Sequence, residues 1–221
     1  MAISIKGVNT GVIRKSNNFI ALALKIKEPR NKESLFFMSV MELRDLLIAL
    51  ESRLHQKHKL DAAAHLQYEQ ARDKVIKKMA ENIPEILVDE LKNADINRRV
   101  NTLELTDNQG ENLTFVLTLH DGSKCELVVN ELQIEMLARA IIHAINNAEM
   151  REATPGKEIE AITRRMLDFS PRLKKLAGVP CQVYVRTVAA NNAQPLTQDQ
   201  CLRALHHLRV QSTSKTAPQA K

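Results

Sequence analysis

Basic side chains are the residues of this sequence whose type and spacing most clearly suggest a chemical task. One group surrounds the Ser170-Pro171 pair and consists of Arg164, Arg165, Arg172, Lys174 and Lys175. Guanidinium and ammonium groups gathered on one side of a fold can neutralise phosphates, and such binding weakens steeply as salt rises. A weaker second group lies in two predicted hairpins and consists of Lys25, Lys27, Arg30, Lys32 and Lys124. Both groups are candidate nucleic-acid contacts, although the solvated surface of an ordinary protein has the same composition.

The charge of the chain is concentrated at one end. The formal net charge is +6, yet residues 151–221 hold 12 basic and five acidic side chains, so the first 150 residues are close to neutral. Such asymmetry points weakly to an anionic partner. Aromatic residues make up only 3% of the chain, and Phe169 and Tyr184 are the ones near the first basic group. Base stacking would therefore be sparse.

Histidines and cysteines offer weaker candidates for metal binding or catalysis. His55, His58 and His65 could share one helix face, but no fourth ligand or acid stands in register with them. Cys201 precedes His206 by about one turn of a predicted helix, a pairing that is conceivable for a nucleophile and more commonly plain packing. We therefore predict no catalytic residue, no metal site and no cofactor, and hence no enzyme.

Several large protein classes are disfavoured by what the sequence lacks. It has no G-x-x-x-x-G-K, G-x-G-x-x-G, H-E-x-x-H or G-x-S-x-G motif, and only six glycines. The cysteines, Cys125, Cys181 and Cys201, lie far apart, which favours a reducing compartment over a disulfide framework. The first residues lack the apolar run of a signal peptide, and no stretch approaches a membrane span. We expect a soluble cytoplasmic protein that does not associate with a membrane.

The elements that would position these side chains come in two similar sets, offset by about 92 residues. Each set opens with Val-Asn-Thr, at 8–10 and at 100–102. An alternating apolar run follows, which predicts a strand with one row of side chains in a core and the other row toward solvent or a second layer. The apolar positions are Ile20, Leu22, Leu24 and Ile26 in the first set and Leu113, Phe115, Leu117 and Leu119 in the second. Turn signals end both runs, including the two-residue turn Asp121-Gly122, and a short strand follows at 35–38 and at 126–129.

A helix with the same start follows each short strand. Ser39 with Glu42, and Asn130 with Gln133, are N-cap residues with a capping-box partner three positions on. The apolar stripes match at a shift of 91 residues, in the pairs Met41/Leu132, Leu43/Ile134, Leu46/Leu137, Leu47/Ala138, Leu50/Ile141 and Leu54/Ile145. These patterns predict an α+β fold of two antiparallel sheet-plus-helix (β-β-β-α) repeat units that pack as a pseudo-symmetric pair. Hairpin-then-helix units also arise without a common origin.

The remaining segments complete the predicted organisation. A helix is expected from about Leu60 to Asn82 and a shorter one at 85–93, with Pro84 at its start. A helix at 157–168 and a strand at 182–189 are expected after the turn signal Thr154-Pro155-Gly156. The predicted divisions are a first strand-strand-helix unit (1–55), a helical insert (56–98), a second strand-strand-helix unit (99–150), a small basic α/β tail (151–210) and a disordered, polar C-terminus (211–221).

The chain as a whole resembles an uncharacterised enterobacterial family, the YjeJ type. The resemblance runs through MAISIKGVNTGVIRKSNNF, the two repeat helices and the tail GVPCQVYVRTVAANNAQPLTQDQCLRALHHL, and so covers nearly all of the sequence. It implies no functional residues, because none is established for the family. It does imply that relatives are longer, with extra residues between about Met150 and Glu152, and that this chain is a shortened form.

The repeat unit is also similar in outline to the strands-then-helix modules of whirly and Pur-alpha type single-strand nucleic-acid binders. The matching features are the strand run, the Ser39 and Asn130 caps and the apolar helix stripes. They are architectural features of low specificity, and likeness of fold does not transfer function.

Two functional hypotheses remain. The first is a non-catalytic binding module whose partner is single-stranded DNA or RNA, or else a protein. The alternative is a protein-interaction or assembly component without nucleic-acid binding, for which apolar sheet faces could make a homodimer. An enzyme would be indicated by a concave pocket that holds two or more of Cys201, His206 and His143, and nothing in the sequence predicts one.

Overall fold

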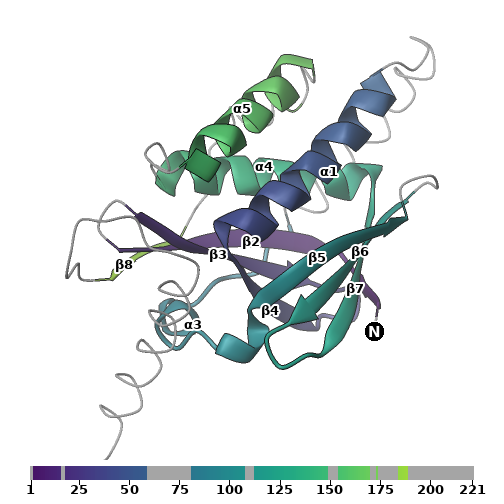
Figure 1. Ribbon diagram of the computed structural model, residues 1–221. Coiled ribbons are helices and arrows are strands. Elements are labelled where there is room, and N and C mark those ends of the chain that lie inside the picture. The colour runs from purple at the N-terminus through teal and green to yellow at the C-terminus, as the bar shows by residue number, and fades with distance from the viewer. Residues whose placement is uncertain are drawn as a thin grey trace, which may run out of the picture.

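The structure, a computed structural model, describes residues 2–15, 18–58, 81–107, 112–148, 154–169, 173 and 184–188. These residues have the predicted α+β architecture, with helices packed over two four-stranded sheets (Figure 1). Sheet 1 has the order β4-β3-β2-β8 and comprises β2 (Gly7–Lys15), β3 (Asn18–Lys27), β4 (Glu33–Met38) and β8 (Tyr184–Val188). Sheet 2 has the order β1-β7-β6-β5 and comprises β1 (Ala2–Ser4), β5 (Val100–Asp107), β6 (Asn112–Leu119) and β7 (Lys124–Asn130).

Each sheet contains an antiparallel three-stranded meander from one predicted unit and a parallel edge strand from elsewhere. β1 lies at the start of the first unit but pairs with β7 of the second, whereas β8 comes from the tail and pairs with β2. An isolated bridge between Phe37 and Arg99 further connects the two sheets. β1 and this bridge connect the two units, whereas β8 connects the tail to the first unit. A pseudo-symmetric pairing and a common origin of the units stay predictions.

The helices cross from one unit to the other. α1 (Val40–His58) follows β4 yet also contacts β5, and α4 (Glu131–Ala148) follows β7 yet packs on β2. The inward faces of both sheets therefore share one core with these helices, which includes the predicted stripes from Leu43 to Leu54 and from Ile134 to Ile145. α5 (Thr154–Phe169) lies along α1. The described parts of the predicted tail thus pack against the first unit, α5 through α1 and β8 through β2.

Both predicted helix starts are confirmed. The amide of Asn130 donates to Gln133 Oε1 at 2.8 Å and the amide of Gln133 donates to Asn130 Oδ1 at 3.0 Å, which is a reciprocal capping box. At α1 the amide of Ser39 donates to Glu42 Oε2 at 3.0 Å, and the hydroxyl of Ser39 donates to the same oxygen.

The hairpin turns are more alike than the sequence suggested. Asp121-Gly122 is part of a three-residue turn rather than a two-residue one, because the Leu119 amide donates to Ser123 O at 2.8 Å and the Gly122 amide to Leu119 O at 3.0 Å. The Glu28 amide donates to Lys32 O and the Asn31 amide to Glu28 O in the same pattern. The residue with positive φ is Asn31 in one turn (59°) and Gly122 in the other (81°). A three-residue loop with a left-handed last residue suits the twist of paired strands.

The Val-Asn-Thr match is not a structural equivalence. Val8 lies opposite Ile26, and Leu103 lies opposite Leu117, the counterpart of Ile26 at the shift of 91. Strand pairing therefore aligns Val8 with Leu103, not with Val100. Irregularities in β5 on both sides of this pair break the simple offset.

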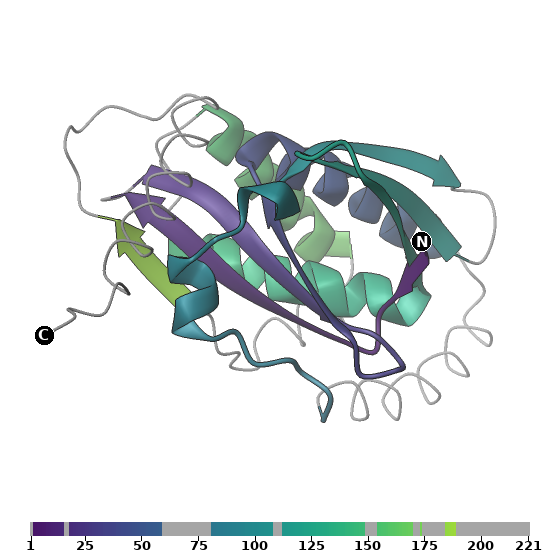
Figure 2. The ribbon, with the colours of Figure 1, turned by 90° about the horizontal axis from the view of Figure 1, so that it is seen from below.

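Residues 82–94, which we call the strap, cover the outward face of sheet 1 (Figure 2). The predicted helix at 85–93 shrinks to α3 (Val88–Lys92), followed by the short helix η1 (Ile96–Arg98). Before α3 the strap is extended, because its polar and apolar groups are held by the sheet: Pro84 O accepts from Asn9 Nδ2 at 2.8 Å, and Ile86 is fully buried. Most of the predicted helix from Leu60, the predicted helix with Cys201 and His206, and the tail at 211–221 lie outside the described residues.

Candidate functional site

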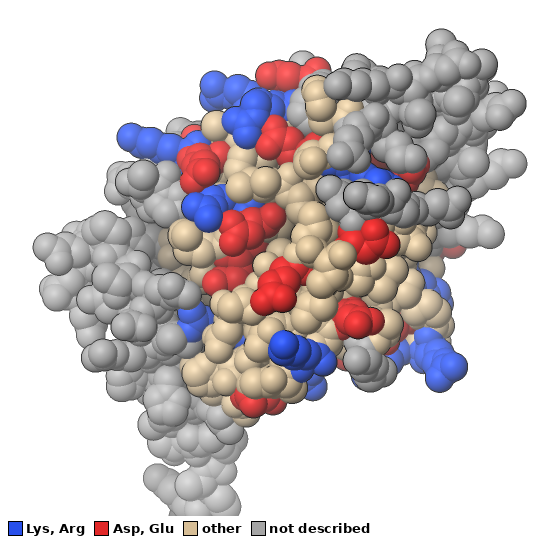
Figure 3. All heavy atoms as spheres, turned by 45° about the vertical axis from the view of Figure 1, so that its right-hand side comes forward, with Lys and Arg blue, Asp and Glu red and all other residues tan. Residues whose placement is uncertain are grey.

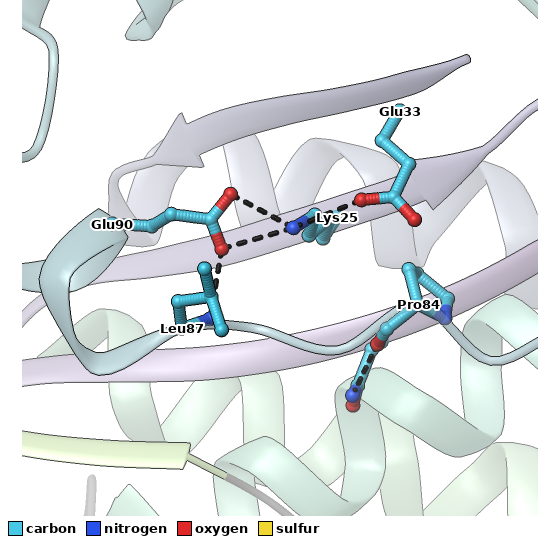
Figure 4. A network of polar contacts seen from close by, with 6 residues as sticks. Lys25, Glu33, Pro84, Leu87 and Glu90 are labelled. Atoms are coloured by element: carbon cyan, nitrogen blue, oxygen red, sulfur yellow. Dashed lines mark hydrogen bonds and ion pairs between the residues drawn. The ribbon is translucent and has the colours of Figure 1, made fainter.

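Lys25, one of the predicted phosphate contacts, is a buried structural residue. It lies on the outward face of β3 and is 5% exposed. Its Nζ donates to Glu90 Oε1 at 2.8 Å and Oε2 at 2.9 Å, and lies 3.0 Å from Glu33 Oε2 (Figure 4). Glu90 Oε2 also accepts from the Leu87 amide at 2.8 Å, at the start of α3. Lys25 therefore anchors the strap to the sheet, and its ammonium group is not presented to a phosphate.

Replacing Lys25 by methionine is expected to lower the free energy of unfolding by about 2 kcal/mol, because two partly hydrated carboxylates lose a charged hydrogen-bond donor. Burial by itself lowers the pKa of Lys25, but the hydrogen bonds with Glu90 and Glu33 outweigh it and raise that pKa above 10.5. Since the folded state has the higher pKa, the contribution is complete below pH 10.5 and is lost as the pH rises through the folded-state value. Urea unfolding at neutral and alkaline pH measures both effects.

The exposed pair Lys92 and Asp89, 3.7 Å apart, provides the control for this prediction. Lys92→Met is expected to change stability by less than about 0.5 kcal/mol, because an exposed ion pair contributes little. Equal losses in Lys25→Met and Lys92→Met would contradict the anchoring role of Lys25.

The other members of the second basic group do come together. They lie with two further cations in what we call the basic edge, defined as Lys6, Lys27, Arg30, Lys32, Arg98 and Lys124. Lys6 joins the β3–β4 turn through two bonds, from its amide to Lys27 O at 2.8 Å and from its Nζ to Asn31 Oδ1 at 3.2 Å. Figure 2 shows this turn beside the start of β2. The first hairpin is thereby placed next to β1, which pairs with β7.

The thiol of Cys125 shows that the basic edge continues onto sheet 2. Burial raises the pKa of this half-buried thiol, and the positive charges of Arg98 and Lys32 offset part of that increase. Both cations therefore lie close to β7, where Lys124 is the neighbour of Cys125 and is exposed. Two carboxylates lie among these six cations. Glu28 Oε1 is 3.8 Å from Lys32 Nζ and accepts from the Ser34 hydroxyl at 3.0 Å, and Asp121 accepts from Ser123 near Arg98, which lowers the Asp121 pKa. The edge is consequently a surface with a local excess of positive charge.

The first basic group is only partly described, and the part that is described is divided. Arg165 makes a bidentate ion pair with Glu51 on α1, at 2.6 Å and 2.9 Å. Arg164 is exposed. Arg172, Lys174 and Lys175 lie outside the described residues. A phosphate at this group would have to compete with Glu51 for Arg165.

A groove of about 440 Å³ lies between the C-terminal halves of α1 and α5. It is lined by Ile48, Glu51, Ser52, His55, Arg165 and Asp168. Ile48 is 44% exposed and is one of five large apolar side chains that are exposed among the described residues. The groove does not contain His143, and the other residues that would indicate an enzyme, Cys201 and His206, lie outside the described part of the chain.

Within the described ranges, no group of three or more His, Cys, Asp or Glu side chains could hold a metal ion. His55 is exposed on α1, whereas the side chain of His58 and the whole of His65 are not described. No helix in the described ranges is long and apolar enough to cross a membrane.

Sequence reasoning missed Lys6 and Arg98 as members of the basic edge, and Glu90 as the partner of Lys25. Lys6 stands alone between β1 and β2, and Arg98 lies in a linking segment. Lys6 has no basic neighbour in sequence, and Arg98 is followed only by Arg99, which is buried, so no signal in the sequence would have joined them to the hairpins.

Comparisons with known proteins support the resemblance on which the sequence analysis relied. A protein of Escherichia coli strain K12 named uncharacterized protein YjeJ is 76% identical over 289 residues, an alignment that covers 100% of both chains. Because this chain has 221 residues, the relative contains residues without a counterpart here. No solved structure matches the chain, so the likeness to whirly and Pur-alpha modules stays a prediction. The family model described as YjeJ-like matches in two parts, residues 1–155 and 151–215, and the chain therefore belongs to the YjeJ-like family.

Proposed function

We propose that this protein is a non-catalytic binding module that holds single-stranded DNA or RNA along the basic edge. The supporting observation is that two hairpins, the connection between β1 and β2 and the segment before β5 bring six cations to one side, although they are far apart in sequence. Phosphates attract such a surface whatever the base sequence, and each contact releases counterions. We also place the protein in the cytoplasm, because its cysteines lack the spacing of a disulfide framework.

Contacts with the backbone, rather than with the bases, are the expected mode of binding. Phe36, Phe37 and Phe115 are each at most 1% exposed, and Phe19 packs against the core. Three of the four phenylalanines whose side chains are described are therefore closed to a base, and Phe19 is the one that is partly exposed. Low sequence preference and strong salt dependence follow from this mode.

Reversal of two charges at the centre of the basic edge tests the proposal. Arg30→Glu with Lys32→Glu is expected to weaken binding to a labelled single strand by about tenfold or more at low salt, and to reduce the slope of log affinity against log salt by about 1.4. The measurement is fluorescence anisotropy across a salt series. Lys92→Glu with Lys157→Glu makes the same change in net charge on exposed residues elsewhere and is expected to alter both quantities much less.

The outcomes of this experiment separate the candidate surfaces. Unchanged binding in the Arg30/Lys32 variant would overturn the proposal. If a variant with glutamate at Arg164, Arg165, Lys174 and Lys175 abolishes binding instead, the site belongs to the first basic group.

Protein interaction is the second candidate, and the exposed Ile48 in the groove between α1 and α5 favours it. An apolar side chain surrounded by charged ones is a common feature of protein contact surfaces. This reading predicts a mass in sedimentation that rises with protein concentration, together with no retention of nucleic acid.

A further inference from the structure

Among the described residues, the outward face of sheet 2 is at most partly buried, whereas the corresponding face of sheet 1 is buried. On sheet 1 the outward residues Ile13, Ala21, Ala23 and Phe37 are at most 2% exposed, because the strap packs on them through Ile86, Leu91 and Ala94. On sheet 2 no outward residue is buried. The residues of this open face are Thr102, Glu104, Thr114, Val116, Thr118, Lys124, Glu126 and Val128.

The two faces correspond position by position. Lys25 pairs with Leu35 and Ala23 with Phe37 on sheet 1, whereas Val116 pairs with Glu126 and Thr114 with Val128 on sheet 2. Each residue of the second set lies 91 positions after its counterpart, the same shift that relates the helices. Val116 therefore occupies the place of Lys25, and Val128 that of Phe37.

The covering segment of sheet 1 has a definite place in the chain order, since it follows the helix of its own unit. The strap comes after α1 and before the next strand, β5. The corresponding place in the second unit is the stretch between α4, which ends at Ala148, and α5, which begins at Thr154. The family match divides at 151–155, which places the additional residues of the longer relative at this junction.

The charges of the open face indicate what would pack there. Glu104 and Glu126 lie opposite Val116 on its two neighbouring strands. The side of the molecule where sheet 2 lies has Asp and Glu side chains across its middle (Figure 3). Two carboxylates on either side of an apolar position would accept hydrogen bonds from a basic side chain laid over Val116. On sheet 1 the strand supplies Lys25 and the strap supplies Glu90. On sheet 2 the strands would supply the two glutamates, and the covering segment would supply the basic side chain.

We propose that the outward face of sheet 2 is a docking surface for a second strap, the segment that the longer relative carries at the 151–155 junction. This segment packs as an extended chain across β6 and places a lysine or arginine between Glu104 and Glu126. The present chain lacks the segment and keeps the face that receives it.

A cysteine at Val116 reports whether this face is covered. Val116→Cys is made in this chain and in the same chain with the relative's additional residues restored between Met150 and Thr154. Alkylation by a maleimide is followed by peptide mass spectrometry, which separates this site from the native cysteines. Restoring the segment is expected to slow the reaction of Cys at position 116 by about tenfold or more, as burial of a side chain does. Lys92→Cys, on α3 over the other sheet, serves as the control and is expected to react at the same rate in both chains.

Two further variants keep the test decisive. The same cysteine at the aligned position of the full-length E. coli relative is expected to be protected as well, which guards against a graft that fails to fold. Glu104→Lys with Glu126→Lys is expected to restore fast labelling in the grafted chain and to leave the rate in the ungrafted chain unchanged. Equal rates at position 116 with and without the segment, in both the graft and the relative, would overturn the proposal.

Discussion

Phe37→Ala is expected to lower the free energy of unfolding by about 4 kcal/mol, the usual cost of removing a fully buried phenylalanine ring. Phe37 is 1% exposed and belongs to the smaller core, in which the strap residues Ile86, Leu91 and Ala94 meet the outward face of sheet 1. Its loss leaves a cavity beneath the strap and beside the bridge to Arg99. Urea unfolding measures the loss of stability, and faster hydrogen exchange at the strap amides is expected to show that the strap loosens.

Val128→Ala is the matched control, because Val128 holds the corresponding position on sheet 2 and is only half-buried. It is expected to cost less than about 1 kcal/mol, since little apolar surface is withdrawn from water at that position. Similar losses for Phe37→Ala and Val128→Ala would contradict the claim that one face is covered and the other is open.

Gly7→Ala is expected to destabilise the protein by about 3 kcal/mol through a clash between two backbone segments. A Cβ atom at position 7 would lie 2.0 Å from Asn82 O and 2.7 Å from Asn82 C, where the strap begins. Backbone atoms cannot rotate away as the end of a side chain can, so the strap would have to shift. We expect faster hydrogen exchange at the Leu87 amide and a lower urea concentration at the midpoint of unfolding.

Gly122→Ala separates this steric cost from the ordinary cost of replacing glycine. Gly122 has a φ of 81° and no atom within 4 Å of an added Cβ. Its substitution is expected to cost about 1 kcal/mol, from the left-handed backbone alone. If Gly7→Ala cost no more than Gly122→Ala, the close approach of the strap to β2 would be disproved.

The elements themselves could be predicted well because their signals are local. The alternating run from Leu113 to Leu119 and the stripe from Leu43 to Leu54 each bury one face, and the Asn130–Gln133 cap closes within three residues. The run from Ile20 to Ile26 is buried on both faces, because the strap forms a second layer over sheet 1. The α+β class and both β-β-β-α units followed from such patterns. The start of α3 was harder to predict. Pro84 accepts a hydrogen bond from Asn9 on β2 and Ile86 packs in the core beneath the strap, so neither residue belongs to the helix.

The candidate site was predictable only in part, because charge alone does not tell where a side chain points. Lys25 and Lys27 look equivalent in sequence, yet Lys25 is enclosed by Glu33 and Glu90 while Lys27 lies at the basic edge. Arg164 and Arg165 are neighbours in the chain, but one is exposed and the other is paired with Glu51.

By itself the sequence determined the periodicities, the caps and the turns of this protein, since these depend on residues within a few positions of one another. Tertiary structure alone decided that α1 and α4 each contact the sheet of the other unit. It also decided that β1 and β8 pair with strands far from them in sequence, and that the strap covers the outward face of sheet 1 but not that of sheet 2. Those outcomes depend on shape and charge complementarity between surfaces far apart in the chain, such as Glu90 against Lys25 and Asn82 against Gly7. No local pattern encodes such a match, because it exists only when both surfaces have formed.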